Sequence, residues 1–208
     1  MPAPAGVDAG PLRDTHGSVV GGPLQTENLK RFSKKGLTKP KSSDIIITER
    51  EKERTKMKRT IYFDMDGTIA DFYGVNGWLK YLEKSQTKPY RTARPIFASY
   101  KTDFFALIEK LQKKGYKIGV ISWSSKCGTA DFHNRIRKAK LGWLAKNFPF
   151  AEEIHIIPYG TDKKSVALDK DGYLVDDEDK NLENWGKNAI PAWEMVNYLE
   201  KLANGKEF

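Results

Sequence analysis

Cysteine, histidine and long apolar runs are scarce in this sequence of 208 residues. Its one cysteine, Cys127, cannot form an internal disulfide, which is typical of proteins in a reducing compartment. Two of its three histidines, His133 and His155, lack the spacing of metal ligands. No stretch approaches the roughly 18 consecutive apolar residues of a membrane span, and the first residues lack the apolar segment of a secretory signal. We therefore expect a soluble, cytoplasmic protein that has no membrane partner.

Basic residues outnumber acidic ones, but they are not concentrated in one region. The chain holds 36 Lys and Arg against 27 Asp and Glu, a formal net charge of +9. Clustered basic side chains are typical of proteins that bind nucleic acid, whereas here the excess is spread over the whole chain. The charge therefore disfavours a nucleic-acid partner and favours attraction of small anionic substrates.

The composition changes near residue 57. Residues 1–43 are rich in Pro, Gly, Ala and basic side chains and show no apolar period, so they cannot bury enough surface to offset chain entropy. We interpret residues 1–56 as a disordered basic extension and residues 57–208 as one folded domain. The chain is 39% hydrophobic, which is enough for one core in that domain. We expect residues 57–208 to suffice for folding and activity.

Strand and helix patterns alternate through the second region. Short apolar runs predict strands at 60–63, 116–122, 153–160 and 172–177, and apolar residues at helical spacing predict helices at 103–115 and 131–148. This alternation predicts an α/β fold: a Rossmann-like, mainly parallel sheet with helices on both faces. Three tryptophans in or near helical patterns, Trp143, Trp185 and Trp193, are expected in its core.

Polar residues follow the predicted strands where each strand ends. Asp64 and Asp66 follow the first strand, Ser122 closes the second, and Asp176 and Asp177 close the last. Because ligands bind at the carboxyl ends of strands in such sheets, we expect these side chains to meet. Neighbouring carboxylates repel one another, and a hard cation with oxygen ligands such as Mg²⁺ relieves that repulsion. The sequence therefore predicts a Mg²⁺ site.

The acids after the first strand also suit phosphoryl transfer. A carboxylate beside Mg²⁺ can attack phosphorus and form an aspartyl-phosphate that water hydrolyses. The second acid, Asp66, can give a proton to the leaving oxygen and later take one from water. Gly67 allows a sharp turn in which backbone N–H groups approach the phosphate.

These residues resemble a known family. The segment DMDGT (64–68) after an apolar strand resembles the first signature of the haloacid dehalogenase superfamily, most of whose members are Mg²⁺-dependent phosphatases. IGVIS (118–122) resembles its second signature, YGTDKKS (159–165) contains the expected lysine, and GYLVDDEDKN (172–181) resembles its acidic fourth signature. The signatures occur in the required order, so residues 57–208 resemble a hydrolase domain of this superfamily.

The resemblance implies roles for the residues of the first signature. Asp64 would be the nucleophile and a metal ligand. Asp66 would be the acid and base, with its backbone carbonyl on the metal. Phe72 would lie near the organic part of the substrate.

It also implies roles for the later signatures. Ser122 would be the phosphate-binding hydroxyl, and Lys163 would bind the phosphate and neutralise the aspartates. Lys164 is an alternative to Lys163, because the two lysines are adjacent. Asp177 is the first choice for the direct metal ligand, and Asp176 either joins it or holds a metal-bound water.

Within the superfamily, DMDGTIADF resembles the start of 5'-nucleotidases of the deoxyribonucleotidase type and of short nucleotidase-like proteins of phages and bacteria. This implies a Mg²⁺-dependent phosphomonoester hydrolase acting on a small phosphorylated substrate, a nucleoside monophosphate. Residues 71–101 would form a small cap insertion after the first strand, in which we expect Trp78, Tyr81 and Tyr90 to pack rather than to contact substrate.

Three alternative functions remain open from the sequence. The first is a phosphatase for a sugar phosphate or another small metabolite. The second is a non-catalytic binding protein with the same fold, which the presence of both Asp64 and Asp66 argues against. The third is a nucleic-acid-end phosphatase recruited through the basic extension.

Overall fold

The structure, a computed structural model, describes residues 59–206. The predicted extension, residues 1–56, lies outside the described residues, as does the predicted domain start at residue 57. None of the helices within 59–206 has the length and apolar character needed to cross a membrane.

A five-stranded parallel sheet organises the described chain. Its strand order is β5-β4-β1-β6-β7, and each neighbouring pair is parallel. The strands are β1 (Thr60–Phe63), β4 (Lys117–Trp123), β5 (Glu153–Ile157), β6 (Tyr173–Asp176) and β7 (Ala189–Pro191). The chain adds β4 and β5 on one side of β1 and then crosses to add β6 and β7 on the other. The predicted Rossmann-like α/β fold is therefore confirmed.

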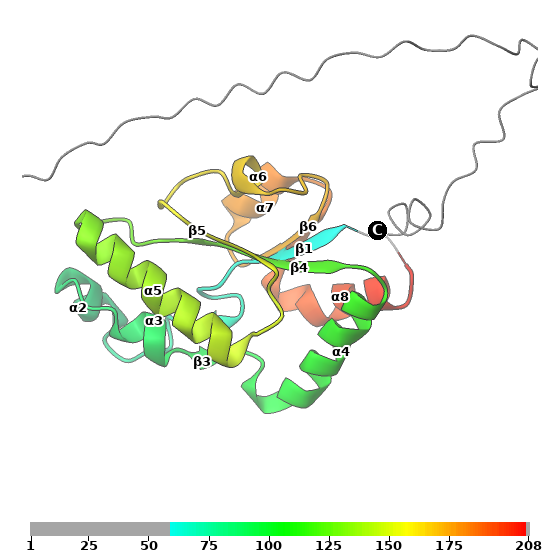
Figure 1. Ribbon diagram of the computed structural model, residues 1–208, viewed down its shortest axis with the longest axis horizontal. Coiled ribbons are helices and arrows are strands. Elements are labelled where there is room, and N and C mark those ends of the chain that lie inside the picture. The colour runs from blue at the N-terminus through cyan, green and yellow to red at the C-terminus, as the bar shows by residue number, and fades with distance from the viewer. Residues whose placement is uncertain (1–58, 207–208) are drawn as a thin grey trace, which may run out of the picture. The chain divides into compact units, whose positions relative to one another are not determined.

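Helices cover both faces of this sheet (Figure 1). One core packs Ile61 and Phe63 of β1 with the helices α4 (Lys101–Lys113), α5 (Ala130–Asn147) and α8 (Met195–Ala203). The other packs Tyr62 with residues of α6 (Lys163–Val166) and α7 (Asp179–Trp185). Successive side chains of a strand point to opposite faces, so β1 is buried on both sides.

The predicted elements of the central region are confirmed, with shifts of a few residues at their ends. The predicted elements did not include α7, β7 or α8, which follow the last predicted strand. The prediction for Trp193 was wrong, because its side chain is 68% exposed. Trp193 lies in the 3₁₀ turn η2 (Ala192–Glu194), before the buried stripe of α8 that begins at Met195. Trp143 and Trp185 are buried, as expected.

The segment predicted as a small cap lies between β1 and α4. It contains β2 (Ala70–Asp71), α2 (Trp78–Glu83), α3 (Lys88–Thr92), β3 (Arg94–Pro95) and η1 (Ala98–Tyr100), with β2 and β3 paired in a short antiparallel ladder. Phe72 and Tyr90 from this segment pack against Phe132 and Ile136 of α5. The segment is thereby held over the carboxyl-terminal end of the sheet.

Candidate active site

The predicted site residues lie at the carboxyl ends of the three central strands. Asp64 follows β1, Ser122 lies near the end of β4, and Asp176 ends β6. The chain changes direction across the sheet at β1, and the crevice outside such a switch point is where α/β sheets bind ligands.

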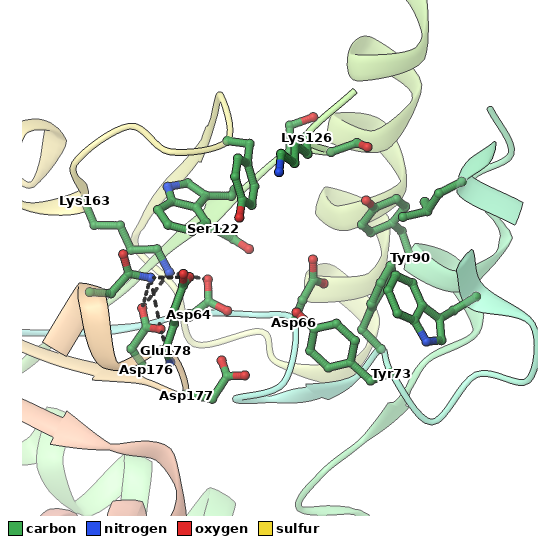
Figure 2. A pocket seen from close by; sticks show the side chains of 18 of the residues that line it. Asp64, Asp66, Tyr73, Tyr90, Ser122, Lys126, Lys163, Asp176, Asp177 and Glu178 are labelled. Carbon is green, nitrogen blue, oxygen red and sulfur yellow. Dashed lines mark hydrogen bonds and ion pairs between the residues drawn. The ribbon is translucent and has the colours of Figure 1, made fainter. Parts of the chain in front are cut away.

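One cavity of about 530 Å³ is lined by every residue assigned to the site from the sequence. These residues are Asp64, Asp66, Phe72, Ser122, Lys163, Asp176 and Asp177. Figure 2 shows the acidic side chains at one side of the cavity and Tyr73 and Tyr90 at the other, with Asp66 between them. The cavity therefore has an ionic end and an aromatic end.

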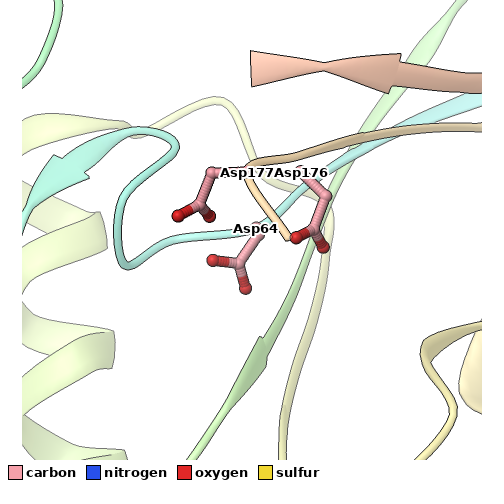
Figure 3. A group of neighbouring side chains, drawn as sticks. All are labelled: Asp64, Asp176 and Asp177. Carbon is pink, nitrogen blue, oxygen red and sulfur yellow. The ribbon is translucent and has the colours of Figure 1, made fainter. Parts of the chain in front are cut away.

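Three carboxylates gather at the ionic end (Figure 3). Asp64, Asp176 and Asp177 each offer an oxygen atom, and these atoms all lie within 4.8 Å of one another. Burial, together with the charge of Asp64, raises the pKa of Asp176 to about 6 and that of Asp177 to about 7. Placing these charges together is therefore unfavourable without a cation.

Lys163 supplies one positive charge to this cluster. Its side chain is 3% exposed, and its Nζ donates to Asp64 Oδ1 and to Asp176 Oδ2, both at 2.6 Å. Burial alone would lower the pKa of Lys163, but the two carboxylates raise it. Lys164 points elsewhere and donates to the backbone carbonyl of Trp185 at 2.8 Å. The structure thus places Lys163, and not Lys164, in the cavity.

Side chains from α7 and the preceding loop fix the orientation of Asp176. Asn181 Nδ2 donates to both carboxylate oxygens of Asp176 at 3.2 Å. The backbone N–H of Glu178 donates to Asp176 Oδ1 at 3.0 Å. Asn181 also lines the cavity and was not singled out from the sequence.

The loop after β1 brings the first signature against the last. Gly67 has a φ of 91°, in the left-handed region that favours glycine. A Cβ atom there would lie 2.2 Å from Asp177 Oδ2, so the turn requires glycine for space as well as for conformation. The next residue, Thr68, donates from its hydroxyl to Asp177 Oδ1 at 3.1 Å.

Lys140 is the main residue of the site that sequence reasoning missed. Its side chain is fully buried, and its Nζ donates to Asp66 Oδ2 at 2.6 Å, to Ser122 Oγ at 2.8 Å and to the Trp123 carbonyl at 2.7 Å. Burial raises the pKa of Asp66 and so does Asp64, while Lys140 opposes them. The other oxygen, Asp66 Oδ1, is buried and has no hydrogen-bond partner within residues 59–206.

A signal for Lys140 was present in the sequence. Lys140 follows Ile136 by four residues and precedes Trp143 by three, and both of these side chains are buried. This spacing places all three on one face of α5. A lysine on the apolar stripe of a helix needs a buried partner, and an acidic signature elsewhere in the chain was the obvious candidate.

Aromatic side chains form the other end of the cavity. Phe72 lies with its ring centroid 4.7 Å from that of Tyr90 and 5.5 Å from that of Trp78. On a second wall the centroids of Trp123 and Tyr159 are 4.8 Å apart. Trp78 and Tyr90 thus both pack in the cap and line the cavity, whereas Tyr81 accepts a hydrogen bond from Lys88 at 2.8 Å.

The donor set of the acidic cluster fits a hard divalent cation. Beside the Lys163 ammonium group, the metal-ligating atoms that converge there are carboxylate oxygens, which are ligands that Mg²⁺ and Ca²⁺ take from proteins. Asp66 is not among the three clustered side chains, which agrees with its proposed contact through the backbone carbonyl rather than the carboxylate.

Comparison with protein families and with curated proteins found no match to this chain.

Proposed function

We propose that this protein is a Mg²⁺-dependent phosphomonoester hydrolase of the haloacid dehalogenase type that forms an aspartyl-phosphate at Asp64. One observation carries the proposal: Asp64, Asp176 and Asp177 converge within 4.8 Å, and Lys163 bridges Asp64 and Asp176 in the same cavity. A nucleophilic carboxylate, a cation site and a buried ammonium group together can stabilise the charge that phosphoryl transfer develops.

Asp64 acts as the nucleophile, and Asp66 acts as the acid and base. In the first step an oxygen of Asp64 bonds to phosphorus, the ester P–O bond breaks, and the leaving oxygen takes the proton of Asp66. In the second step water attacks phosphorus, Asp66 takes the proton of that water, and the Asp64–phosphorus bond breaks. Burial raises the pKa of Asp66, which favours the protonated form that the first step needs.

The remaining residues orient and neutralise the phosphate. Ser122 Oγ accepts a hydrogen bond from Lys140, so its own proton is available to a phosphate oxygen. Lys163 offsets the negative charge of Asp64 before attack. Bound between Asp64, Asp176 and Asp177, Mg²⁺ would supply further positive charge beside the transferring phosphoryl group.

The aromatic end of the cavity favours a nucleoside monophosphate over a sugar phosphate. Four aromatic side chains line that end: Phe72, Tyr73, Trp78 and Tyr90. Aromatic side chains can stack on any nucleobase, because every base has a flat π face. A sugar phosphate offers hydroxyls in place of a planar ring and would leave these faces without a matching surface.

The test is phosphate release from nucleoside monophosphates, sugar phosphates and p-nitrophenyl phosphate, with and without Mg²⁺. We expect turnover that chelation abolishes and Mg²⁺ restores, with the highest kcat/KM for a nucleoside monophosphate. Asp64→Asn should be inactive. Lys164→Met, which changes a residue outside the cavity, should keep wild-type turnover and serves as the control. Full activity in excess chelator, or wild-type turnover by Asp64→Asn, would contradict the proposal.

A further inference from the structure

A second cavity adjoins the active-site cavity. It has a volume of about 380 Å³ and lies between the loop after β4, helix α5 and the end of β5. Four residues line both cavities: Ser124, Ser125, Lys126 and Tyr159. A ligand bound in the first cavity can therefore extend into the second without leaving the protein surface.

The lining of the second cavity is basic. Lys126, His133 and Arg137 line it, and no Asp or Glu does among the described residues that surround it. This contrasts with the acidic end of the first cavity, where Asp64, Asp176 and Asp177 meet. Figure 2 shows Lys126 on the side of the first cavity away from Asp176 and Asp177.

Arg137 is a residue of this lining that is available to a ligand. Its neighbour on the same helix, Arg135, forms an ion pair with Asp131 at 2.8 Å. Arg137 is exposed and has no carboxylate partner within the described part of the chain. An arginine fork presents parallel N–H donors that match two oxygens of a phosphate.

Hydroxyl and aromatic groups complete the lining. Ser124 Oγ lies 2.7 Å from His133 Nδ1, so the two side chains form a hydrogen-bonded pair at the junction of the cavities. Lys126 Nζ lies 5.8 Å from the ring centroid of Tyr159. Ile156, Ile157 and Pro158 form an apolar wall of the same cavity. Charged donors and hydroxyls beside such a wall can bind an oxyanion while the wall contacts the organic part of the same ligand.

We propose that the second cavity is a subsite for a second phosphate group of the substrate, bound by Arg137 and Lys126 while the phosphomonoester to be cleaved lies at Asp64. The proposal rests on the proposed function for the identity of the first site. The proposal requires a substrate that carries a second phosphate besides the phosphomonoester at Asp64. Two sources share that chemistry: a nucleoside bisphosphate and the phosphodiester of a short oligonucleotide.

The experiment compares three substrates: adenosine 5'-monophosphate, adenosine 3',5'-bisphosphate and the dinucleotide pApA. Wild-type protein should show a kcat/KM about tenfold higher for a substrate with a second phosphate, the effect of one charged hydrogen bond. Arg137→Gln should remove that preference. Lys138→Gln is the matched control, because Lys138 is the next residue of α5, is exposed and lines neither cavity.

The two sources give different patterns. A higher kcat/KM for the bisphosphate alone would identify the group bound in the second cavity as a phosphate monoester. A higher kcat/KM for pApA alone would identify it as a phosphodiester. Either result supports the subsite. Equal kcat/KM for all three substrates, or the same preference in Arg137→Gln and Lys138→Gln, overturns it. In that case phosphate release from adenosine 5'-monophosphate still supports the proposed function.

Binding measured without turnover keeps the two proposals separate. In the Asp64→Asn background, calorimetry should show adenosine 3',5'-bisphosphate binding about tenfold more tightly than the monophosphate. Adding Arg137→Gln should abolish the difference, whereas adding Lys138→Gln should not. If no substrate is hydrolysed but this difference is found, the proposed function fails and the subsite stands.

Discussion

At the residue scale, Asp64 and Asp66 stand two positions apart and have different basic partners. Asp64 Oδ1 accepts from Lys163, which also contacts Asp176, whereas Asp66 Oδ2 accepts from Lys140. Asp64 therefore belongs to the ionic cluster, at which the proposed function would bind the phosphate. Asp66 belongs to a separate buried pair that faces the middle of the cavity, where a leaving group would lie.

This difference predicts distinct defects for two matched variants. Asp64→Asn removes the nucleophile and should stop both phosphoenzyme formation and turnover. Asp66→Asn removes a proton donor and acceptor and should slow turnover by roughly 10²- to 10⁴-fold. With p-nitrophenyl phosphate, whose leaving group needs no proton, Asp66→Asn should form the phosphoenzyme and then accumulate it.

Rapid quench with labelled substrate, followed by mass spectrometry of the peptide containing residues 60–71, measures both effects. Wild-type protein and Lys164→Met provide the controls. Label on any residue other than Asp64 would rule out the assignment of the nucleophile.

Lys140 is predicted to position Asp66 and Ser122. Lys140→Met leaves a buried carboxylate without its cation, which should destabilise the fold by about 3–5 kcal/mol. A positioning role adds a second effect: kcat/KM, which reports the steps up to phosphoenzyme formation, should fall more for a nucleoside monophosphate than for p-nitrophenyl phosphate, because only the former needs the proton of Asp66 in that step. Thermal melting and parallel kinetics below the melting temperature measure the two effects.

The matched control is Lys164→Met, because Lys164 is not part of the cavity lining and its Nζ lies against Trp185, 2.8 Å from the backbone carbonyl and 6.0 Å from the ring centroid. An equal fall in kcat/KM for both substrates would show that Lys140 is structural only. Stability and turnover both at wild-type levels would contradict the buried ion pair itself.

The residues of the site could be predicted largely because a parallel sheet gathers the carboxyl ends of its strands. The acids that follow the predicted strand 60–63 and those that end the predicted strand 172–177 could be assigned to the site from that rule alone. Lys140 and Asn181 could not be assigned in this way, since each reaches the site from a helix and depends on how that helix is rotated. The choice between Lys163 and Lys164 depended on rotation in the same way, because adjacent residues of α6 point about 100° apart.

At the element scale, the turn after β1 couples the two acidic segments. Gly67→Ala would force a Cβ to within 2.2 Å of Asp177 Oδ2 at a positive φ. We expect displacement of Asp177 and weaker Mg²⁺ binding, so that half-maximal turnover requires a Mg²⁺ concentration about tenfold higher, equivalent to roughly 1.4 kcal/mol. A Mg²⁺ titration of turnover measures this change.

Gly186→Ala separates the contact from the backbone strain. Gly186 has a φ of 87°, and a Cβ there would meet nothing within 4 Å. Both variants should lose stability because a side chain disfavours a positive φ, and Gly186→Ala by roughly 1–3 kcal/mol, because its ψ of −144° lies in a region essentially confined to glycine. Only Gly67→Ala should change the Mg²⁺ requirement, and a similar change in Gly186→Ala would show that the contact with Asp177 is not its cause.

Prediction of the elements depended on their length. Helices α4 and α5 have clear apolar periods and were found, whereas β7 spans Ala189–Pro191 and is too short to show alternation. Helix α8 has a buried stripe at Met195, Leu199 and Leu202, so its apolar period could have been recognised. Trp193 was misassigned because an aromatic residue near a helical pattern was taken to share that stripe.

At the scale of the whole molecule, the fold holds its acids at one edge against their mutual repulsion. Asp64 and Asp176 are buried, and Lys163 offsets only part of their charge. Such an arrangement lowers stability at the site where, under the proposed function, a cation and a phosphate would bind, as is common where function competes with packing. Stability of the metal-free protein should therefore respond to pH and to Mg²⁺ together.

In the folded protein, burial and the charge of Asp64 raise the pKa of Asp176 to about 6 and that of Asp177 to about 7, from an ordinary value of 3.8. Between pH 4 and pH 7 the folded state thus binds more protons than the unfolded state, so stability should fall as pH rises through this window. The melting temperature of metal-free protein should be lower at pH 8 than at pH 5.5. Lys163, whose pKa is raised, stays charged throughout and adds no slope here.

Mg²⁺ should reverse this trend, because it binds the deprotonated carboxylates of the folded state. Added Mg²⁺ should raise the melting temperature more at pH 8 than at pH 5.5. The control is Asp177→Asn, which keeps the acceptor for Thr68 but removes one titrating charge, so the metal-free slope should be shallower than in wild type. A slope unchanged by Asp177→Asn, or a Mg²⁺ effect that is larger at pH 5.5, would show that this carboxyl group does not couple folding to the cation site.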